Sequence, residues 1–198
     1  MFGLFYRIGF TPWEGHALPG RLRELAEGPG ALPKGKALDV GCGTGDTSIY
    51  LARRGWSVRA IDFVDVALKR AAAKAKAAGV DVEFTRADVT QLTSFGVGDG
   101  FRLIVDSGCL HGLSDDQRTA YVKQVTAVAT PDATLLLLGF AERKRRGPRG
   151  YNRPEIEQRF SESWELRGSW KDDAVSNDAN DPLYVYELRR RSATPVSS

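Results

Sequence analysis

A glycine-rich turn between an apolar run and a helical pattern is the feature that most constrains the fold of this chain. Residues 37–40 form the apolar run, residues 41–45 carry three glycines, and residues 47–54 place apolar side chains at helical spacing. The same strand and helix unit recurs from residue 57. Strands that alternate with helices predict the α/β class, with a doubly wound and mostly parallel sheet that helices cover on both faces.

The rest of the chain extends this pattern and then changes it. The strand expected at 134–140 is almost continuously apolar, which is typical of a strand buried on both faces of a parallel sheet. Residues 164–170 and 183–189 alternate between apolar and polar side chains, so we expect them to pair as an antiparallel edge. Ser114, followed by acidic residues, marks a helix start. The expected elements are strands at 37–40, 57–61, 82–85, 101–105 and 134–140 and helices at 21–27, 47–54, 64–78, 115–129 and 154–160.

The length of 198 residues suits one hydrophobic core better than two. We therefore expect a single domain over residues 1–191. It would comprise an aromatic N-terminal cap at 1–33, a ligand-binding core at 34–140 and a C-terminal region at 141–191. The polar tail at 192–198 is expected to be disordered.

Charge and cysteine content limit the possible partners and the compartment. The net charge of +3 permits an anionic ligand but is too small to indicate nucleic-acid binding by itself. Two cysteines cannot build a disulfide framework, so a reducing, cytoplasmic location is expected. No secretory signal is expected at 1–10, and no apolar run approaches the roughly 20 residues of a membrane span. With two histidines in the chain, no metal site is predicted.

The glycine turn itself, Asp39-Val40-Gly41-Cys42-Gly43-Thr44-Gly45, lies where the first strand turns into the first helix. Glycines let the backbone approach a ligand closely, and the helix that follows offers free N–H groups. A dinucleotide fingerprint would need another glycine at position 46, where this chain has Asp46. The turn therefore predicts a cradle for a polar ligand other than NAD.

Two further acids follow the next two strands. Asp62 ends the second strand, seventeen residues past Gly45, where a carboxylate can accept hydrogen bonds from both hydroxyls of an adenosine ribose. Asp88 follows the third strand and could accept from an adenine amino group. Both acids fall at the carboxyl edge of the sheet, where open α/β folds bind their ligands.

With these motifs in order, the segment from Leu38 to Phe140 resembles the class I S-adenosylmethionine-dependent methyltransferases. The resemblance implies S-adenosylmethionine as the cofactor and a Rossmann-like, seven-stranded sheet whose last strand is antiparallel. It also implies that the backbone near Asp106 and Ser107 holds the methionyl ammonium group together with Gly41. The cofactor-binding residues that it implies are Asp39, Gly41, Cys42, Gly43, Thr44, Gly45, Asp62, Phe63, Asp88, Val89, Asp106 and Ser107.

A narrower resemblance is to the small thiopurine-methyltransferase and tellurite-resistance type enzymes. It is carried by residues 106–111, by Arg118-Thr-Ala-Tyr121 and by residues 155–160. It implies a small-molecule methyl acceptor with a sulfur, oxygen or nitrogen nucleophile. The chain lacks the Asn/Asp-Pro-Pro-aromatic tetrad of the adenine and glutamine amide methyltransferases of this fold, so those acceptors are not expected.

His111, beyond the fourth strand, is the candidate general base if the acceptor must lose a proton, although it could also be a packing residue. Trp13 is the candidate lid and cofactor contact, with simple core packing as the alternative. Cys109 is expected to be a small buried residue.

Two other functions stay open at this stage. The basic run at 143–146, with Arg149 and Arg153 nearby, could serve an anionic acceptor or an RNA substrate, although such a run is more often a solvated loop. The chain could also be a non-catalytic protein that binds S-adenosylmethionine, because fold does not fix function. The oligomeric state cannot be read from the sequence.

Overall fold

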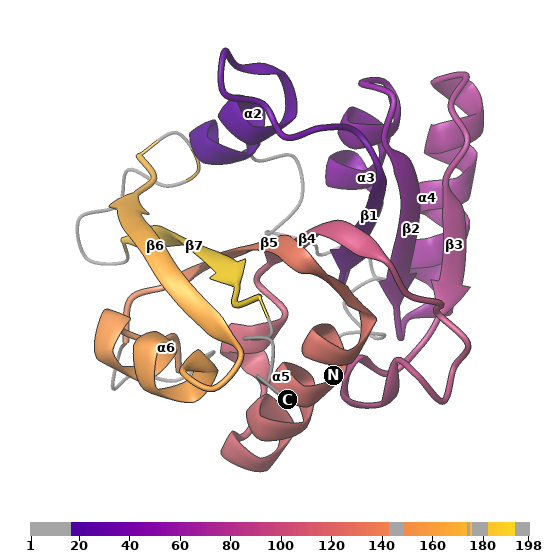
Figure 1. The fold of residues 1–198 in the computed structure, drawn as a ribbon. Coiled ribbons are helices and arrows are strands. Elements are labelled where there is room, and N and C mark those ends of the chain that lie inside the picture. The colour runs from indigo at the N-terminus through magenta and orange to yellow at the C-terminus, as the bar shows by residue number, and fades with distance from the viewer. Residues whose placement is uncertain (1–16, 143–148, 174, 176–181, 193–198) are drawn as a thin grey trace, which may run out of the picture.

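Seven strands form one sheet in the computed structural model, which describes residues 17–142, 149–173, 175 and 182–192. The strand order is β3-β2-β1-β4-β5-β7-β6 (Figure 1). Every pair from β3 to β5 is parallel, and β7 is antiparallel to both β5 and β6. The strands are β1 (Lys36–Val40), β2 (Ser57–Asp62), β3 (Glu83–Arg86), β4 (Phe101–Ser107), β5 (Ala129–Phe140), β6 (Trp164–Lys171) and β7 (Leu183–Arg190).

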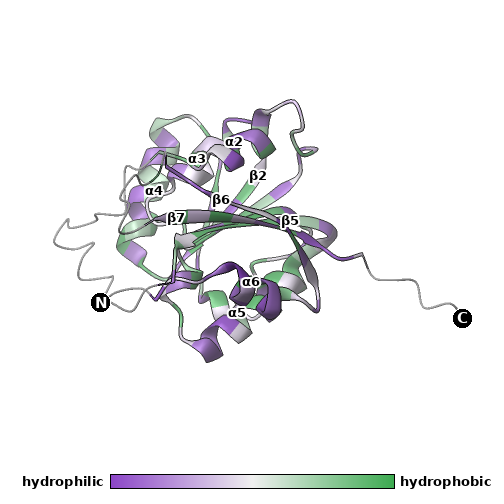
Figure 2. Ribbon diagram, turned by 90° about the vertical axis from the view of Figure 1, so that its left-hand side faces the viewer, coloured by the Kyte–Doolittle hydropathy of each residue, from purple (hydrophilic) through white to green (hydrophobic). Residues whose placement is uncertain are grey.

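Helices cover both faces of the sheet. Figure 2 shows the sheet nearly edge-on, with α2, α3 and α4 on one side and α5 and α6 on the other. Two short 3-10 helices, η1 and η2, follow β3 and β4. The helices are α2 (Gly20–Glu27), α3 (Asp46–Ala52), α4 (Asp65–Ala77), η1 (Val89–Gln91), η2 (Leu110–Gly112), α5 (Asp115–Val128) and α6 (Arg153–Phe160).

The apolar side chains of the central strands divide between the two faces. Leu38 and Ile104 pack with the α5 and α6 side of the core, whereas Leu103 and Leu136 pack with Leu22 of α2 on the opposite side. All five side chains are buried. This two-sided burial explains why these strands read as nearly continuous apolar runs rather than alternating ones.

The α/β class, the seven-stranded sheet and the antiparallel last strand are confirmed. The expected pairing of 164–170 with 183–189 is also present, as β6 with β7. Ser114 caps α5 as predicted, and with Gln117 it forms a capping box that satisfies two backbone N–H groups.

One boundary was wrong. The sequence predicts a gap between the helix expected at 115–129 and the strand expected at 134–140, but β5 begins at Ala129, directly after α5. The pairing register between β4 and β5 jumps from Ala129 opposite Phe101 to Thr134 opposite Leu103. This irregularity accommodates Pro131, which has no N–H to give to a regular ladder.

The fold places a row of loops at the carboxyl edge of the parallel strands, after β1, β2, β3, β4 and β5. Among the described residues, no helix has the length and apolar character needed to cross a membrane. Trp13, His16, the basic run at 143–146 and the tail from 193 onward lie outside the described residues.

Candidate active site

The loop after β1 is folded around three glycines with left-handed backbone angles. Gly41, Gly43 and Gly45 have φ values of 67°, 54° and 81°, which side chains with a Cβ rarely adopt. The loop is fixed to β2 because Cys42 N donates to Ile61 O at 2.8 Å. The sequence thus supplies glycine where the chain must reverse closely at the end of β1.

Two of these glycines also meet close neighbours. A Cβ at Gly41 would lie 3.0 Å from the Cβ of Cys109, and Gly41 itself is exposed. A Cβ at Gly45 would lie 3.0 Å from the Cβ of Ala71 and 3.3 Å from the ring of Phe84. Gly45 therefore permits packing of α3 against α4 and β3, whereas Gly41 leaves its backbone open at the sheet edge.

Thr44 and Asp46 both contact Lys74, which lies in the last turn of α4. Lys74 forms an ion pair with Asp46 and a 3.3 Å contact with the Thr44 hydroxyl. Asp46 stands in the first turn of α3, where a dinucleotide-binding loop would have glycine. Its carboxylate puts negative charge where a pyrophosphate would have to lie.

Asp62 ends β2 and holds the glycine loop. Its two carboxylate oxygens accept from Gly43 N at 2.9 Å and from Val64 N at 2.8 Å. Burial raises the pKa of Asp62, and these backbone donors oppose the rise. The next residue, Phe63, has an exposed fraction of 58%, which is unusual for a large apolar side chain. The end of β2 therefore combines a buried carboxylate with an accessible apolar ring.

Asp88 and Val89 follow β3, as Asp62 and Phe63 lie at the end of β2. Asp88 is exposed, and its Oδ1 accepts from the backbone N–H and the hydroxyl of Thr90, at 2.8 and 2.7 Å. It thereby caps η1, while Val89 is buried in the core. Local capping fixes the direction of the Asp88 carboxylate.

Asp106, at the end of β4, is fully buried and organises the loop that follows. Its Oδ1 accepts from Gly108 N at 2.9 Å and Cys109 N at 2.7 Å, and its Oδ2 accepts from Leu110 N at 3.0 Å. Burial raises the pKa of Asp106 to about 6 against the effect of these donors. Because the carboxylate is occupied by its own loop, the accessible groups here belong to the exposed Ser107.

Three buried or nearly buried carboxyl groups converge beneath the glycine loop. Asp39 accepts from the Ser48 hydroxyl at 2.5 Å. Burial, together with the charges of Asp106 and Asp62, raises the pKa of Asp39 to about 7, although the hydrogen bond from Ser48 opposes the rise. Such a concentration of negative charge at one sheet edge favours a ligand that carries positive charge.

The two cysteines near this edge are free thiols with raised pKa values. For both Cys42 and Cys109 the main cause is burial, and nearby aspartates contribute. The raised pKa values disfavour the thiolate form, which is the nucleophilic form of cysteine. Cys109 was expected to be buried; it is half-buried, with its Cβ close to Gly41. Among the described residues, no cluster of His, Cys, Asp and Glu side chains could hold a metal ion.

His111 lies in η2, in the loop that Asp106 organises. Its ring stacks on Phe140 at the end of β5, with centroids 5.2 Å apart and planes 24° apart. Gly108 provides space for the ring, since a Cβ there would lie 3.1 Å from the His111 Cε1. The side chain thus belongs to the same carboxyl edge as the glycine loop.

Arg118 and Glu155 are polar residues of this region that reasoning from residue chemistry missed. Arg118 has an exposed fraction of 0% and pairs with Glu155 at 2.7 Å. A signal was available, because Arg118 falls on the buried stripe of α5 with Tyr121 and Val125. A charged residue at such a position requires partners inside the protein.

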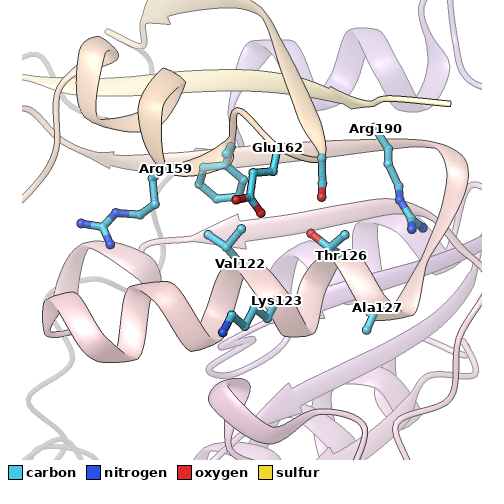
Figure 3. Close-up of a pocket in the computed structure, with 9 residues that line it drawn as sticks. Val122, Lys123, Thr126, Ala127, Arg159, Glu162 and Arg190 are labelled. Atoms are coloured by element: carbon cyan, nitrogen blue, oxygen red, sulfur yellow. The ribbon is translucent and has the colours of Figure 1, made fainter. Parts of the chain in front are cut away.

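A separate cavity of about 320 Å³ lies beside α5, α6 and the end of β7 (Figure 3). None of the candidate cofactor residues within the described part of the chain lines it. Its lining includes Lys123, Thr126, Arg159, Glu162 and Arg190.

The sheet order, the glycine loop and the acidic residues at the strand ends define a Rossmann-like cofactor-binding protein. The family model described as "Methyltransferase domain" matches residues 37–132. A 2-heptyl-1-hydroxyquinolin-4(1H)-one methyltransferase of Mycobacteroides abscessus is 30% identical over 160 residues, which cover 77% of this chain and 68% of that protein.

Solved structures share the whole fold at lower identity. The 1,6-didemethyltoxoflavin-N1-methyltransferase of Burkholderia thailandensis, solved with S-adenosylhomocysteine, has a TM-score of 0.77 at 22% identity over 96% of this chain and 86% of its own. A TehB-like methyltransferase from Corynebacterium glutamicum has a TM-score of 0.70 at 19% identity over 96% and 98%. This chain belongs to the class I S-adenosylmethionine-dependent methyltransferases, and S-adenosylmethionine is its cofactor.

Proposed function

We propose that this enzyme transfers the methyl group of S-adenosylmethionine to an oxygen, nitrogen or sulfur atom of a small molecule. The observation that carries the proposal is the carboxyl edge of the sheet. There an exposed backbone at Gly41 and Ser107 stands above the buried carboxyl groups of Asp39, Asp62 and Asp106. When bound, S-adenosylmethionine supplies a methyl group on a positively charged sulfur.

In this proposal each candidate residue has a distinct role toward the cofactor. The Asp62 carboxylate, which already accepts from backbone N–H groups of the glycine loop and of the chain after β2, also accepts from the ribose hydroxyls. Phe63 and Val89 flank the adenine, and Asp88 accepts from its amino group. The backbone at Gly41 and Ser107 receives the methionyl ammonium group. The remaining loop residues, Cys42, Gly43, Thr44 and Gly45, shape the turn.

The acceptor side is formed by the loop after β4 and the chain after β5. An imidazole nitrogen of His111 takes the proton when the acceptor is a hydroxyl or an ammonium group. Alignment of the acceptor atom with the methyl group and its sulfur contributes roughly 7 kcal/mol or more to lowering the barrier. We retain Trp13 and the segment 1–33 as the proposed cover of this site, and residues 141–191 as its acceptor-side wall.

The relative from Mycobacteroides abscessus suggests an acceptor to try first. Its name specifies a bicyclic ring that carries a hydroxyl group on nitrogen. The stacked rings of His111 and Phe140 offer an apolar, aromatic boundary at the acceptor side. We therefore propose a hydroxylated or nitrogen-containing heteroaromatic as the acceptor class.

The test is production of S-adenosylhomocysteine with 2-heptyl-1-hydroxyquinolin-4(1H)-one, simple phenols, thiols and nitrogen heterocycles. Turnover with a heteroaromatic, lost in Asp62→Ala and retained in the exposed control Asp65→Ala, supports the proposal. Turnover with none of these small molecules, together with salt-sensitive methylation of RNA, would replace it with the RNA substrate that the basic run suggests.

A further inference from the structure

Arg118 is a buried, charged residue near the start of α5, on the same side of the sheet as α6. It has an exposed fraction of 0%, and the neighbouring buried residues of its helix are apolar or aromatic. Figure 1 shows α5 and α6 lying together beneath the β4 to β7 half of the sheet. An arginine buried in this way is costly unless its guanidinium group is fully paired.

The guanidinium group joins two segments that are far apart in the sequence. On one side, Nε donates to Leu113 O at 3.1 Å and Nη2 donates to His111 O at 3.0 Å. On the other side, Nη2 also donates to Gly150 O at 3.1 Å and Nη1 donates to the Glu155 carboxylate at 2.7 Å. Arg118 thus links the loop that carries His111 to the chain that enters α6.

The second segment is itself fixed to the end of β5. Tyr151 is fully buried, and its N–H donates to Phe140 O at 3.1 Å. Gly150 has a φ of 73°, and a Cβ there would lie 2.3 Å from Ala141 O. The contacts form a closed frame, because Arg118 holds the backbone of His111 and Gly150 while the His111 ring stacks on Phe140.

We propose that Arg118 is a positioning residue for the methyl transfer, which fixes the His111 ring at the acceptor side of the site. Glu155 orients the guanidinium group in turn. The inference rests on the proposed function, in which His111 faces the acceptor. Neither Arg118 nor Glu155 contacts any of the candidate cofactor residues through a hydrogen bond within the described residues. Substitution of Arg118 or Glu155 is therefore expected to affect methyl transfer to the acceptor and not cofactor binding.

Glu155 is well suited to this orienting role. Its Oε1 accepts from Arg118 at 2.7 Å, from Arg149 at 2.8 Å and from Arg159 at 3.2 Å. Arg149 and Arg159 both reach Asp115 as well, at the start of α5. The network ties α5 to α6 on the outside of the frame and leaves Arg118 as its one fully buried member among the described residues.

The first experiment replaces Arg118 with lysine. A lysine keeps the positive charge but cannot reach the carbonyl groups of both segments in the planar geometry of a guanidinium group. The matched control is Arg153→Lys. Arg153 is the first residue of α6 and forms an exposed ion pair with Glu157, so this variant makes the same substitution outside the buried network. In Arg118→Lys we expect kcat with 2-heptyl-1-hydroxyquinolin-4(1H)-one to fall at least tenfold. The calorimetric Kd of S-adenosylmethionine should stay within twofold.

The second readout follows the His111 ring directly. The chain has two histidines, so the imidazole NMR signals of His111 can be assigned by comparison with a His16→Gln variant. These signals should shift in Arg118→Lys and stay in place in Arg153→Lys. If wild-type protein methylates no acceptor, the proposed function fails, and the His111 signals still decide whether Arg118 positions the ring.

A second variant keeps the inference falsifiable if Arg118→Lys does not fold. Glu155→Gln retains an oxygen for Arg118 but removes the charge that three arginines share, and Glu157→Gln is its exposed control. Lower kcat and shifted His111 signals in Glu155→Gln alone support the positioning role. A folded Arg118 or Glu155 variant with unchanged His111 signals and unchanged kcat would overturn it. A parallel loss of cofactor affinity and turnover would also overturn it, since this indicates a general structural role.

Discussion

The buried carboxyl group of Asp39 should make the protein without bound cofactor less stable at neutral pH than in mild acid. Its exposed fraction is 1%, and burial raises its pKa from 3.8 to about 7. The folded state therefore holds this proton more tightly than the unfolded state does. Between these two pKa values the free energy of unfolding falls as the pH rises. Asp39→Asn keeps an oxygen for the Ser48 hydroxyl and removes the part of this pH dependence that Asp39 causes.

The magnitude follows from the shift. A rise from 3.8 to about 7 corresponds to about 4 kcal/mol, at about 1.4 kcal/mol for each pKa unit. Near pH 7.5 Asp39 lowers the free energy of unfolding by almost all of this amount, and near pH 4 it lowers that free energy by less than about 1 kcal/mol. The advantage of Asp39→Asn over wild type should therefore grow by about 3 to 4 kcal/mol from pH 4 to pH 7.5.

Urea unfolding at both pH values measures this difference. The exposed control Asp65→Asn should follow wild type at each pH. Asp106 and Asp62 also have raised pKa values, so Asp39→Asn will retain some decline with pH. A stability advantage of Asp39→Asn that is equal at pH 4 and pH 7.5 would show that Asp39 carries no cost of buried charge.

Three further predictions concern cofactor and turnover. Gly41 has a φ of 67°, and a Cβ at this position would lie 3.0 Å from that of Cys109. Because the backbone must shift to accept the new methyl group, Gly41→Ala should weaken S-adenosylmethionine binding at least tenfold by calorimetry; full affinity would exclude a close backbone approach at Gly41. His111→Gln should lower kcat about 100-fold or more for an acceptor that must lose a proton, with an unchanged cofactor Kd; unchanged kcat would remove His111 from the mechanism. Cofactor affinity should rise between about pH 5.5 and pH 7.5, with proton release detectable in buffers of different ionisation enthalpy, because a cationic ligand favours the charged form of Asp39; a flat profile would contradict the electrostatic account.

Much of the fold could be predicted because its signals are local. The apolar run at 134–140 reveals a central strand, and Ser114 with Gln117 reveals a helix start within four residues. The convergence of Asp39 and Asp62 also follows from sequence, since parallel strands bring their carboxyl ends to one edge. The contact of Asp62 with the glycine loop then needs only the spacing of that loop.

Other features depend on contacts that no local pattern contains. The capture of three backbone N–H groups by Asp106 requires the tight loop at Gly108, which has a φ of 105°. The partner of Arg118 lies 37 residues away at Glu155. A helix–strand junction such as Ala129 is also invisible locally, because it depends on a register shift against β4.

Cofactor binding at the glycine loop and the end of β2 is measured by calorimetric titration of S-adenosylmethionine into the folded wild-type protein and into Asp62→Ala. We expect one site per chain in wild type and at least tenfold weaker binding in Asp62→Ala, while Asp65→Ala binds as wild type does. Absence of binding heat in folded wild-type protein at several temperatures, or equal affinity in Asp62→Ala, would contradict the placement of the cofactor at the glycine loop and the end of β2.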